Sequence, residues 1–117
     1  MNRIKKILFA LLFVILVVFT AIQFIQPVRN ISGQVLQTDI SNTYNVPENV
    51  YTLLKNACYD CHSNNTNYPW YSNIQPVAWL LAMDIKNGKA KINFSEFGSN
   101  SSRRQISKLQ GVENRIK

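Results

Sequence analysis

The chain has 117 residues, a formal net charge of +7, two cysteines and one histidine. This length limits it to one small domain, and a hydrophobic leader leaves about 90 residues for folding, too few for a large self-sufficient core. The basic residues are not interleaved with aromatic ones, so a solvated helix face is favoured over nucleic-acid binding. Such residues can instead steer an acidic partner protein or contact anionic lipid.

An uncharged, almost wholly apolar run extends from Ile7 to Ile25, behind a basic start. Its length suits a membrane span, whereas the apolar core of a cleavable signal peptide has about 7 to 15 residues. No small-x-small cleavage site follows it. We therefore predict that residues 1–26 form an uncleaved anchor, which contacts the membrane through residues 4–25 and keeps its basic end in the cytoplasm.

Residues 27–45 are polar and lack a clear hydrophobic period, which is typical of a tether with little regular structure. A helix is predicted to begin near Pro47 and Glu48, because proline suits the first helical position and a carboxylate suits the N-terminal end of the helix dipole. Apolar residues then recur at helical spacing, on Val50, Leu53, Leu54 and Ala57. This helix leads directly into Cys58.

The segment Cys58-Tyr59-Asp60-Cys61-His62 has the form C-x-x-C-H, the c-type haem attachment sequence. Two thiols three residues apart can add across the two vinyl groups of one porphyrin, and the next imidazole can bind the iron as proximal ligand. These are the only cysteines and the only histidine of the chain. The motif predicts haem c, an iron porphyrin attached covalently through Cys58 and Cys61 and ligated by His62.

Other interpretations of the cysteine pair explain less. A structural disulfide leaves His62 without a role, and a zinc site needs a fourth ligand. A thioredoxin-like pair opens a helix, where the dipole favours thiolate, whereas Cys58 and Cys61 are predicted to close one. The functional hypotheses are therefore a one-electron carrier, then a five-coordinate haem sensor or peroxidase-like protein, then a thiol–disulfide oxidoreductase.

An aromatic cluster, Tyr68-Pro69-Trp70-Tyr71, follows a polar loop after His62. Tyr68, Trp70 and the later Trp79 are candidates for covering the haem edge, although an ordinary core role fits the pattern equally well. Met83 is a candidate distal iron ligand, because a thioether can take the second axial position. A methionine at helical spacing is more often a packing residue, so this alternative stays open.

Two more helices are predicted, one from about Ser72 or Asn73 to Gly88 and one from about Ser101 or Ser102 to the last residue. The second of these has a regular apolar side. Between the two helices, a short stretch of isoleucine and phenylalanine alternates with polar residues too briefly to distinguish a strand from a loop.

The chain resembles a family of single-haem, membrane-anchored bacterial haem-binding domains. The resemblance covers roughly residues 47–109 and rests on the segments CYDCHSN, YPWY and IQPVAW. It implies a mostly α-helical, cytochrome c-like haem domain behind one N-terminal anchor, with Cys58 and Cys61 as thioether positions and His62 as proximal ligand. Such domains usually continue into a Met-Pro segment that supplies the distal ligand, and this chain has no methionine after Met83.

We therefore predict a haem domain over residues 46–117, shortened at its C-terminus. Because bacteria attach haem to C-x-x-C-H outside the cytoplasmic membrane, motif and anchor together predict a single-pass protein of the inner membrane with its domain in the periplasm. The expected activity is that of an electron carrier more than that of an enzyme, with a redox partner protein of unknown identity and no nucleic-acid partner.

Overall fold

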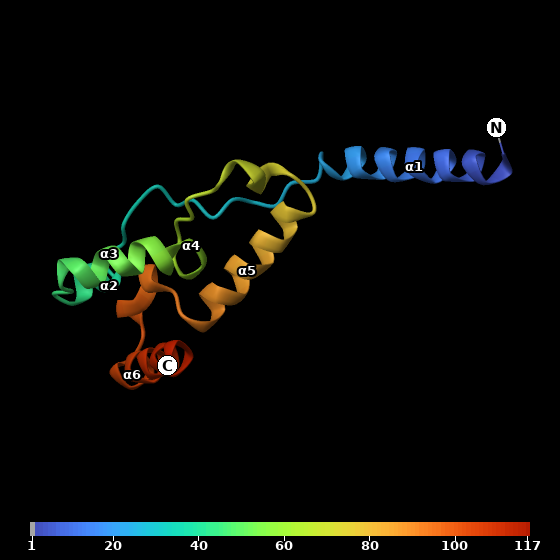
Figure 1. Ribbon diagram of the computed structural model, residues 1–117. Coiled ribbons are helices and arrows are strands. Elements are labelled where there is room, and N and C mark those ends of the chain that lie inside the picture. Colours follow the sequence, from blue (N-terminus) through green and yellow to red (C-terminus); the bar gives the residue numbers. More distant parts are fainter. Residues whose placement is uncertain (1) are drawn as a thin grey trace. The chain divides into compact units, whose positions relative to one another are not determined.

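The computed structural model describes residues 2–117, which are mostly helical, as predicted (Figure 1). These residues form no strand, and an isolated antiparallel bridge pairs Ile31 with Asn65. The chain divides into two compact units, one made of the residues up to Val28 with Pro69–Ala82 and the other of Arg29–Tyr68 with Met83–Lys117. In chain order the elements are α1 (Arg3–Ile22), α2 (Ile40–Thr43), α3 (Glu48–Ala57), α4 (Tyr59–His62), the 3₁₀ helix η1 (Trp70–Asn73), α5 (Val77–Lys91), the 3₁₀ helix η2 (Phe94–Ser99) and α6 (Ser102–Ile116).

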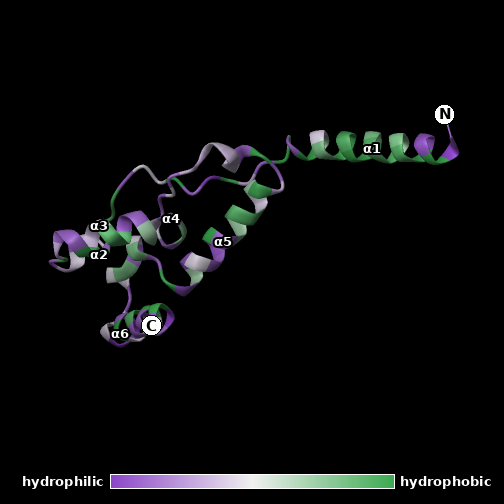
Figure 2. Cartoon of the chain, in the orientation of Figure 1, coloured by the Kyte–Doolittle hydropathy of each residue, from purple (hydrophilic) through white to green (hydrophobic). Residues whose placement is uncertain are grey.

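α1 is apolar along almost its whole length (Figure 2). None of its residues is buried, and it is long and apolar enough to cross a membrane. A helix that is hydrophobic on all sides needs an apolar environment around it, either protein or lipid. The length and composition of α1 are therefore consistent with the predicted membrane span.

Glutamine side chains connect the end of α1 to the segment before α5, within the same compact unit. The backbone N–H of Gln75 donates to Oε1 of Gln23 at 2.9 Å, and Nε2 of Gln23 donates to the carbonyl oxygen of Gln75 at 3.2 Å. Nε2 of Gln75 also donates to the carbonyl oxygen of Ile25 at 2.6 Å. Gln75 is fully buried, and these bonds compensate the cost of burying its amide.

The other unit has a small aromatic core that consists of Ile40, Tyr59, Ile92, Phe94 and Phe97. The short stretch whose conformation the sequence left undecided is the 3₁₀ helix η2. The backbone of η2 departs from helical angles at Glu96, and Phe94 and Phe97 on either side of it are both buried in the core. Tyr59 stacks on Phe94, with 5.5 Å between the ring centroids and an interplanar angle of 3°.

The predicted helices are present, with some differences at their ends. α3 begins at Glu48 directly after Pro47, and α6 begins at Ser102 with Ser101 as its N-cap. α5 begins later than predicted and continues three residues beyond Gly88, to Lys91. The sequence predicts a helix end at Gly88, whereas in the structure this glycine lies inside α5 and makes a close contact with the haem motif, described below.

The segment predicted to be a tether has little regular structure, and α2 is its single described helix. It nevertheless contributes to the core, because Asp39 and Ile40 are both buried. Oδ1 of Asp39 accepts hydrogen bonds from the hydroxyl of Tyr59 at 3.0 Å and from the backbone N–H of Ser41 at 2.9 Å. The sequence did not predict these contacts, because a polar residue in a polar stretch gives no local sign of burial.

Candidate haem site

The two cysteine side chains lie one helical turn apart. Cys58 is the C-cap of α3 and precedes α4, and its carbonyl oxygen accepts from the N–H groups of Cys61 at 3.3 Å and His62 at 3.0 Å. Residues three apart in a helical turn share one face. Both thiols are partly exposed and neither forms a disulfide. This turn therefore presents two free thiols and an imidazole from one short piece of chain.

The imidazole of His62 is held by two backbone carbonyl groups. Its Nδ1 lies 2.9 Å from the oxygen of Gly88 and 3.0 Å from the oxygen of Ile92. Because both partners can only accept, Nδ1 must carry a proton, and in the neutral imidazole Nε2 then has the lone pair. A hydrogen bond of this kind fixes the ring orientation and raises the basicity of the other nitrogen as a metal ligand.

α5 passes so closely over the motif that only glycine fits at position 88. A Cβ atom on Gly88 would lie 2.4 Å from the carbonyl oxygen of Cys61. This close approach brings the carbonyl oxygen of Gly88 within hydrogen-bond distance of His62. Gly88 is thus a residue of the site that sequence reasoning missed, since a glycine at the end of a helical pattern predicts a helix C-terminus.

Tyr59, between the two cysteines, attaches the motif to the core. It is 7 % exposed and its hydroxyl donates to Asp39. Burial, followed by the charge of Asp39, raises the pKa of Tyr59 well above its ordinary value. The neutral phenol is therefore the form that the fold accommodates. Tyr59, which occupies the first x position of C-x-x-C-H, thus holds the motif against the core.

The Cys61 thiol is less acidic than an ordinary cysteine. Burial raises its pKa, and the carboxylates of Asp84 and Asp60 add to the effect. Redox-active thiols have the opposite property, a lowered pKa caused by positive surroundings. The electrostatic environment of Cys61 therefore favours the thiol form at neutral pH.

The three aromatic candidates have different surroundings. Tyr68 is half-buried; its hydroxyl accepts from the N–H of Asn30 at 2.8 Å, and the guanidinium of Arg29 lies 4.3 Å from its ring centroid. Trp70 is 79 % exposed, so a core role for it is wrong, and Trp79 is 39 % exposed. Both tryptophans belong to the other compact unit, and their contact with haem stays a prediction.

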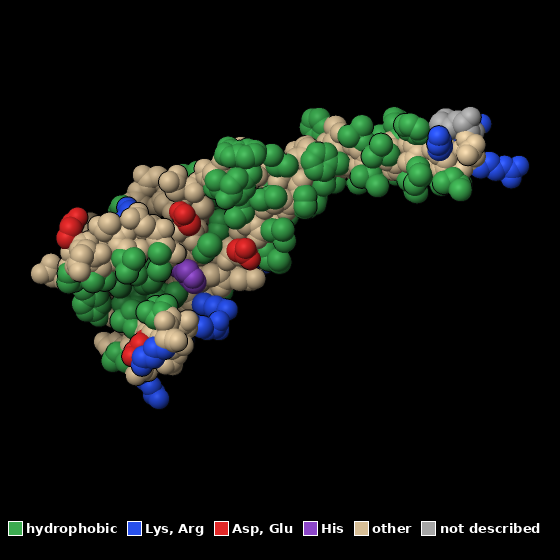
Figure 3. All heavy atoms as spheres, viewed as in Figure 1, with side chains coloured by type: hydrophobic (Ala, Val, Ile, Leu, Met, Phe, Trp, Pro, Cys, Tyr) green, Lys and Arg blue, Asp and Glu red, His purple; other side chains and the backbone are tan. Residues whose placement is uncertain are grey.

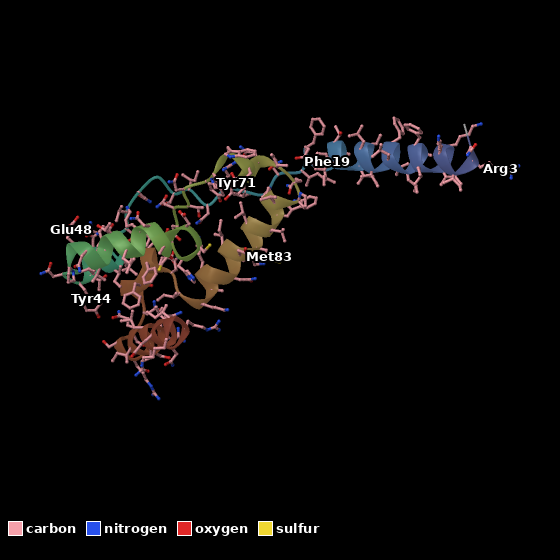
Figure 4. The ribbon with its side chains drawn as sticks, viewed as in Figure 1. Arg3, Phe19, Tyr44, Glu48, Tyr71 and Met83 are labelled. Carbon is pink, nitrogen blue, oxygen red and sulfur yellow. The ribbon has the colours of Figure 1, made fainter. Side chains whose placement is uncertain are left out.

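Met83 lies on α5 (Figure 4), in the same compact unit as the motif. Its side chain is 53 % exposed, so it is not one of the core residues of this unit. The alternative of a packing role is therefore weakened for this methionine. Its role as distal ligand stays a prediction.

The donor set fits an iron porphyrin. Two thiols can bind the porphyrin periphery and one oriented imidazole can bind its metal, whereas a protein-held zinc ion needs four ligands. In residues 2–117, no group of three or more His, Cys, Asp or Glu side chains is placed to hold a metal ion. The imidazole is partly exposed on the surface of this unit (Figure 3), where a ligand can reach it.

These features are those of a small helical haem-binding protein. A model of the haem-binding domain family (Haem_bd) matches residues 17–117, and the chain belongs to this family. Its cofactor is therefore haem. Neither the curated proteins nor the solved structures contain a match to the chain.

Proposed function

We propose that the protein is a membrane-anchored one-electron carrier with haem c attached through Cys58 and Cys61. The observation that carries this proposal is the pair of hydrogen bonds from Nδ1 of His62 to the Gly88 and Ile92 carbonyl oxygens, which leaves Nε2 as the ligand atom. When bound, haem supplies an iron centre that cycles between two oxidation states. The chain supplies two thioether positions and a pre-oriented proximal ligand.

The anchor supports the location that this chemistry needs. α1 is apolar enough to span a membrane, and Arg3, Lys5 and Lys6 precede its apolar part, so we place this end in the cytoplasm. The haem unit is then on the outer side of the inner membrane, in the periplasm. Attachment of haem to C-x-x-C-H takes place there in bacteria.

The role of the single histidine favours an electron carrier over a peroxidase-like enzyme. Cleavage of peroxide needs a proton-transferring group on the distal side, which is typically a histidine. The chain has one histidine, and its Nδ1 is bonded to backbone carbonyl oxygens in the manner of a proximal ligand. We therefore assign His62 to the proximal side.

Covalent attachment is tested with the full chain produced together with a cytochrome c maturation system. Membranes are extracted with acidic acetone, and a pyridine haemochrome spectrum is recorded on the residue. We expect pigment to remain with the wild-type chain and to disappear from the double variant Cys58→Ala, Cys61→Ala. The variant Asn42→Ala, which changes an exposed side chain that bonds only to Leu36 within residues 2–117, serves as the control.

Wild-type chain without retained pigment, in cells where a reference cytochrome c matures, would refute the covalent proposal. His62→Ala separates attachment from ligation, since it is expected to keep the pigment and to lose the spectrum of the histidine-ligated iron. Electron transfer is tested by a reversible one-electron redox titration. Rapid carbon monoxide binding by the reduced protein would favour the five-coordinate sensor instead.

A further inference from the structure

Asn30 connects three separate stretches of the unit that carries the motif. Its side-chain Nδ2 donates to the carbonyl oxygen of Ser63 at 2.8 Å and to Oγ1 of Thr66 at 2.9 Å. Its Oδ1 accepts from the ammonium group of Lys89 at 2.8 Å. Its backbone N–H donates to the hydroxyl of Tyr68, and its carbonyl oxygen accepts from the N–H of Thr66. Every polar group of this residue is therefore used.

The chemistry of the partners determines the orientation of the amide. A lysine ammonium group can only donate, so it must face Oδ1, and a backbone carbonyl can only accept, so it must face Nδ2. The residue has to be an amide, because a carboxylate at position 30 would bring oxygen against the carbonyl oxygen of Ser63. No sequence pattern around Asn30 indicates this role.

The positions of these partners relate Asn30 to the proximal ligand. Ser63 directly follows His62, and Lys89 directly follows Gly88. The bridge from Ser63 through Asn30 to Lys89 therefore lies one residue away from both ends of the hydrogen bond between Nδ1 of His62 and the Gly88 carbonyl. Ser63 is fully buried, and its hydroxyl donates to the carbonyl oxygen of Tyr59 at 2.7 Å, so its backbone is held firmly.

We propose that Asn30 is a positioning residue, which keeps the Gly88 carbonyl oxygen on Nδ1 of His62 and so sets the ligand strength of Nε2. Where it concerns iron, the inference rests on the proposed function; where it concerns the hydrogen bond, it holds for the haem-free chain as well. A weaker hydrogen bond at Nδ1 makes Nε2 a weaker electron donor to iron. Such a ligand stabilises ferric iron less. Loss of Asn30 is therefore expected to raise the reduction potential.

The first test uses the haem-free full chain in detergent micelles. The exchange rate of the His62 Nδ1 proton with water is measured by nuclear magnetic resonance for wild type and Asn30→Ala. Because a net hydrogen bond contributes about 1 kcal/mol, we expect exchange to accelerate by roughly fivefold. Asn42→Ala is the matched control and should leave the rate at the wild-type value. An unchanged rate in well-folded Asn30→Ala overturns the inference.

Two further variants separate the arms of the bridge. Asn30→Asp keeps an oxygen for Lys89 but loses both donors, so it should accelerate exchange as much as Asn30→Ala if the Ser63 arm is needed. Lys89→Met removes the other arm and should accelerate exchange by a smaller factor. If Asn30→Ala loses its helical circular dichroism, the Lys89→Met rate decides, and a wild-type rate in that variant rejects the proposal.

The potential of the haem-loaded chain gives the second readout. Asn30→Ala is expected to have a more positive reduction potential than wild type, while Asn42→Ala keeps the wild-type value. A structural role alone would lower the unfolding temperature without moving the potential. If wild type never retains haem, the proposed function fails, and the proton-exchange measurement still decides the role of Asn30.

Discussion

α1 and the turn that carries the haem motif are stabilised in opposite ways. The large apolar side chains from Ile4 to Phe19 are 43–71 % exposed within the protein, and no residue of α1 is buried. The motif instead depends on two buried residues, Tyr59 and Ser63, and on hydrogen bonds to distant backbone groups. α1 has no buried residue, so its capacity to span a membrane rests on length and apolar composition alone, whereas the motif depends on particular partners and tolerates few changes.

The largest expected effect tests the proposed insertion of α1 into a lipid bilayer. Leu12→Arg combined with Leu16→Arg places two charges near the middle of the apolar stretch, at a cost of about 2.5–3.5 kcal/mol each. The protein should then leave the carbonate-resistant membrane fraction. Leu12→Ala with Leu16→Ala changes the same two positions without adding charge, so it is the control and should stay in that fraction. If the charged variant remains in that fraction, α1 does not act as the anchor.

The next effect tests whether the aromatic core supports the motif. Phe94 is 2 % exposed and packs on Tyr59, so Phe94→Ala should destabilise the haem-free chain by about 3–5 kcal/mol. Trp70→Ala removes a larger side chain that is exposed and should change stability by less than about 1 kcal/mol. Urea unfolding followed by circular dichroism measures both. Equal effects would mean that side-chain size matters here and burial does not.

A smaller effect contrasts two glycines that both lie in helices. Gly88→Ala places a methyl group against the carbonyl oxygen of Cys61 and should destabilise the chain by about 1–3 kcal/mol. Gly111→Ala meets nothing within 4 Å and should stabilise α6 by about 0.5–1 kcal/mol. Urea midpoints give both values. Only the first change should also accelerate exchange of the His62 Nδ1 proton, and a stabilising Gly88→Ala would contradict the close approach of α5.

The smallest effect comes from the buried phenol between the cysteines. The folded-state pKa of Tyr59 is raised, so above the ordinary tyrosine pKa the unfolded chain loses a proton that the folded chain keeps. Stability is then fully present below about pH 10 and falls by about 1.4 kcal/mol per pH unit above it. Tyr59→Phe should flatten this slope in urea titrations between pH 9 and pH 11, taken as about one unit on either side of the ordinary value. A slope that survives the substitution would assign the loss to other groups, Cys61 among them.

Much of the fold could be predicted because its signals are local. The apolar run predicted α1, and helical spacing with a proline and a serine at the starts predicted α3 and α6. η2 could not be predicted, because two phenylalanines three residues apart fit a 3₁₀ turn as well as a loop, and only packing against Tyr59 distinguishes them. The haem-binding role of the three motif residues stays a prediction, which the sequence makes because their spacing matches the size of a porphyrin.

The amino-acid sequence by itself determined the anchor-like helix, the helical character and the trio Cys58, Cys61 and His62, since each of these is encoded within one or two turns of chain. Only the tertiary structure decided which groups orient the imidazole. Its two carbonyl partners are 26 and 30 residues away, and Asn30 is 33 residues from Ser63. Backbone carbonyl groups are the same in every residue, so no sequence pattern can mark the ones that the fold brings to His62.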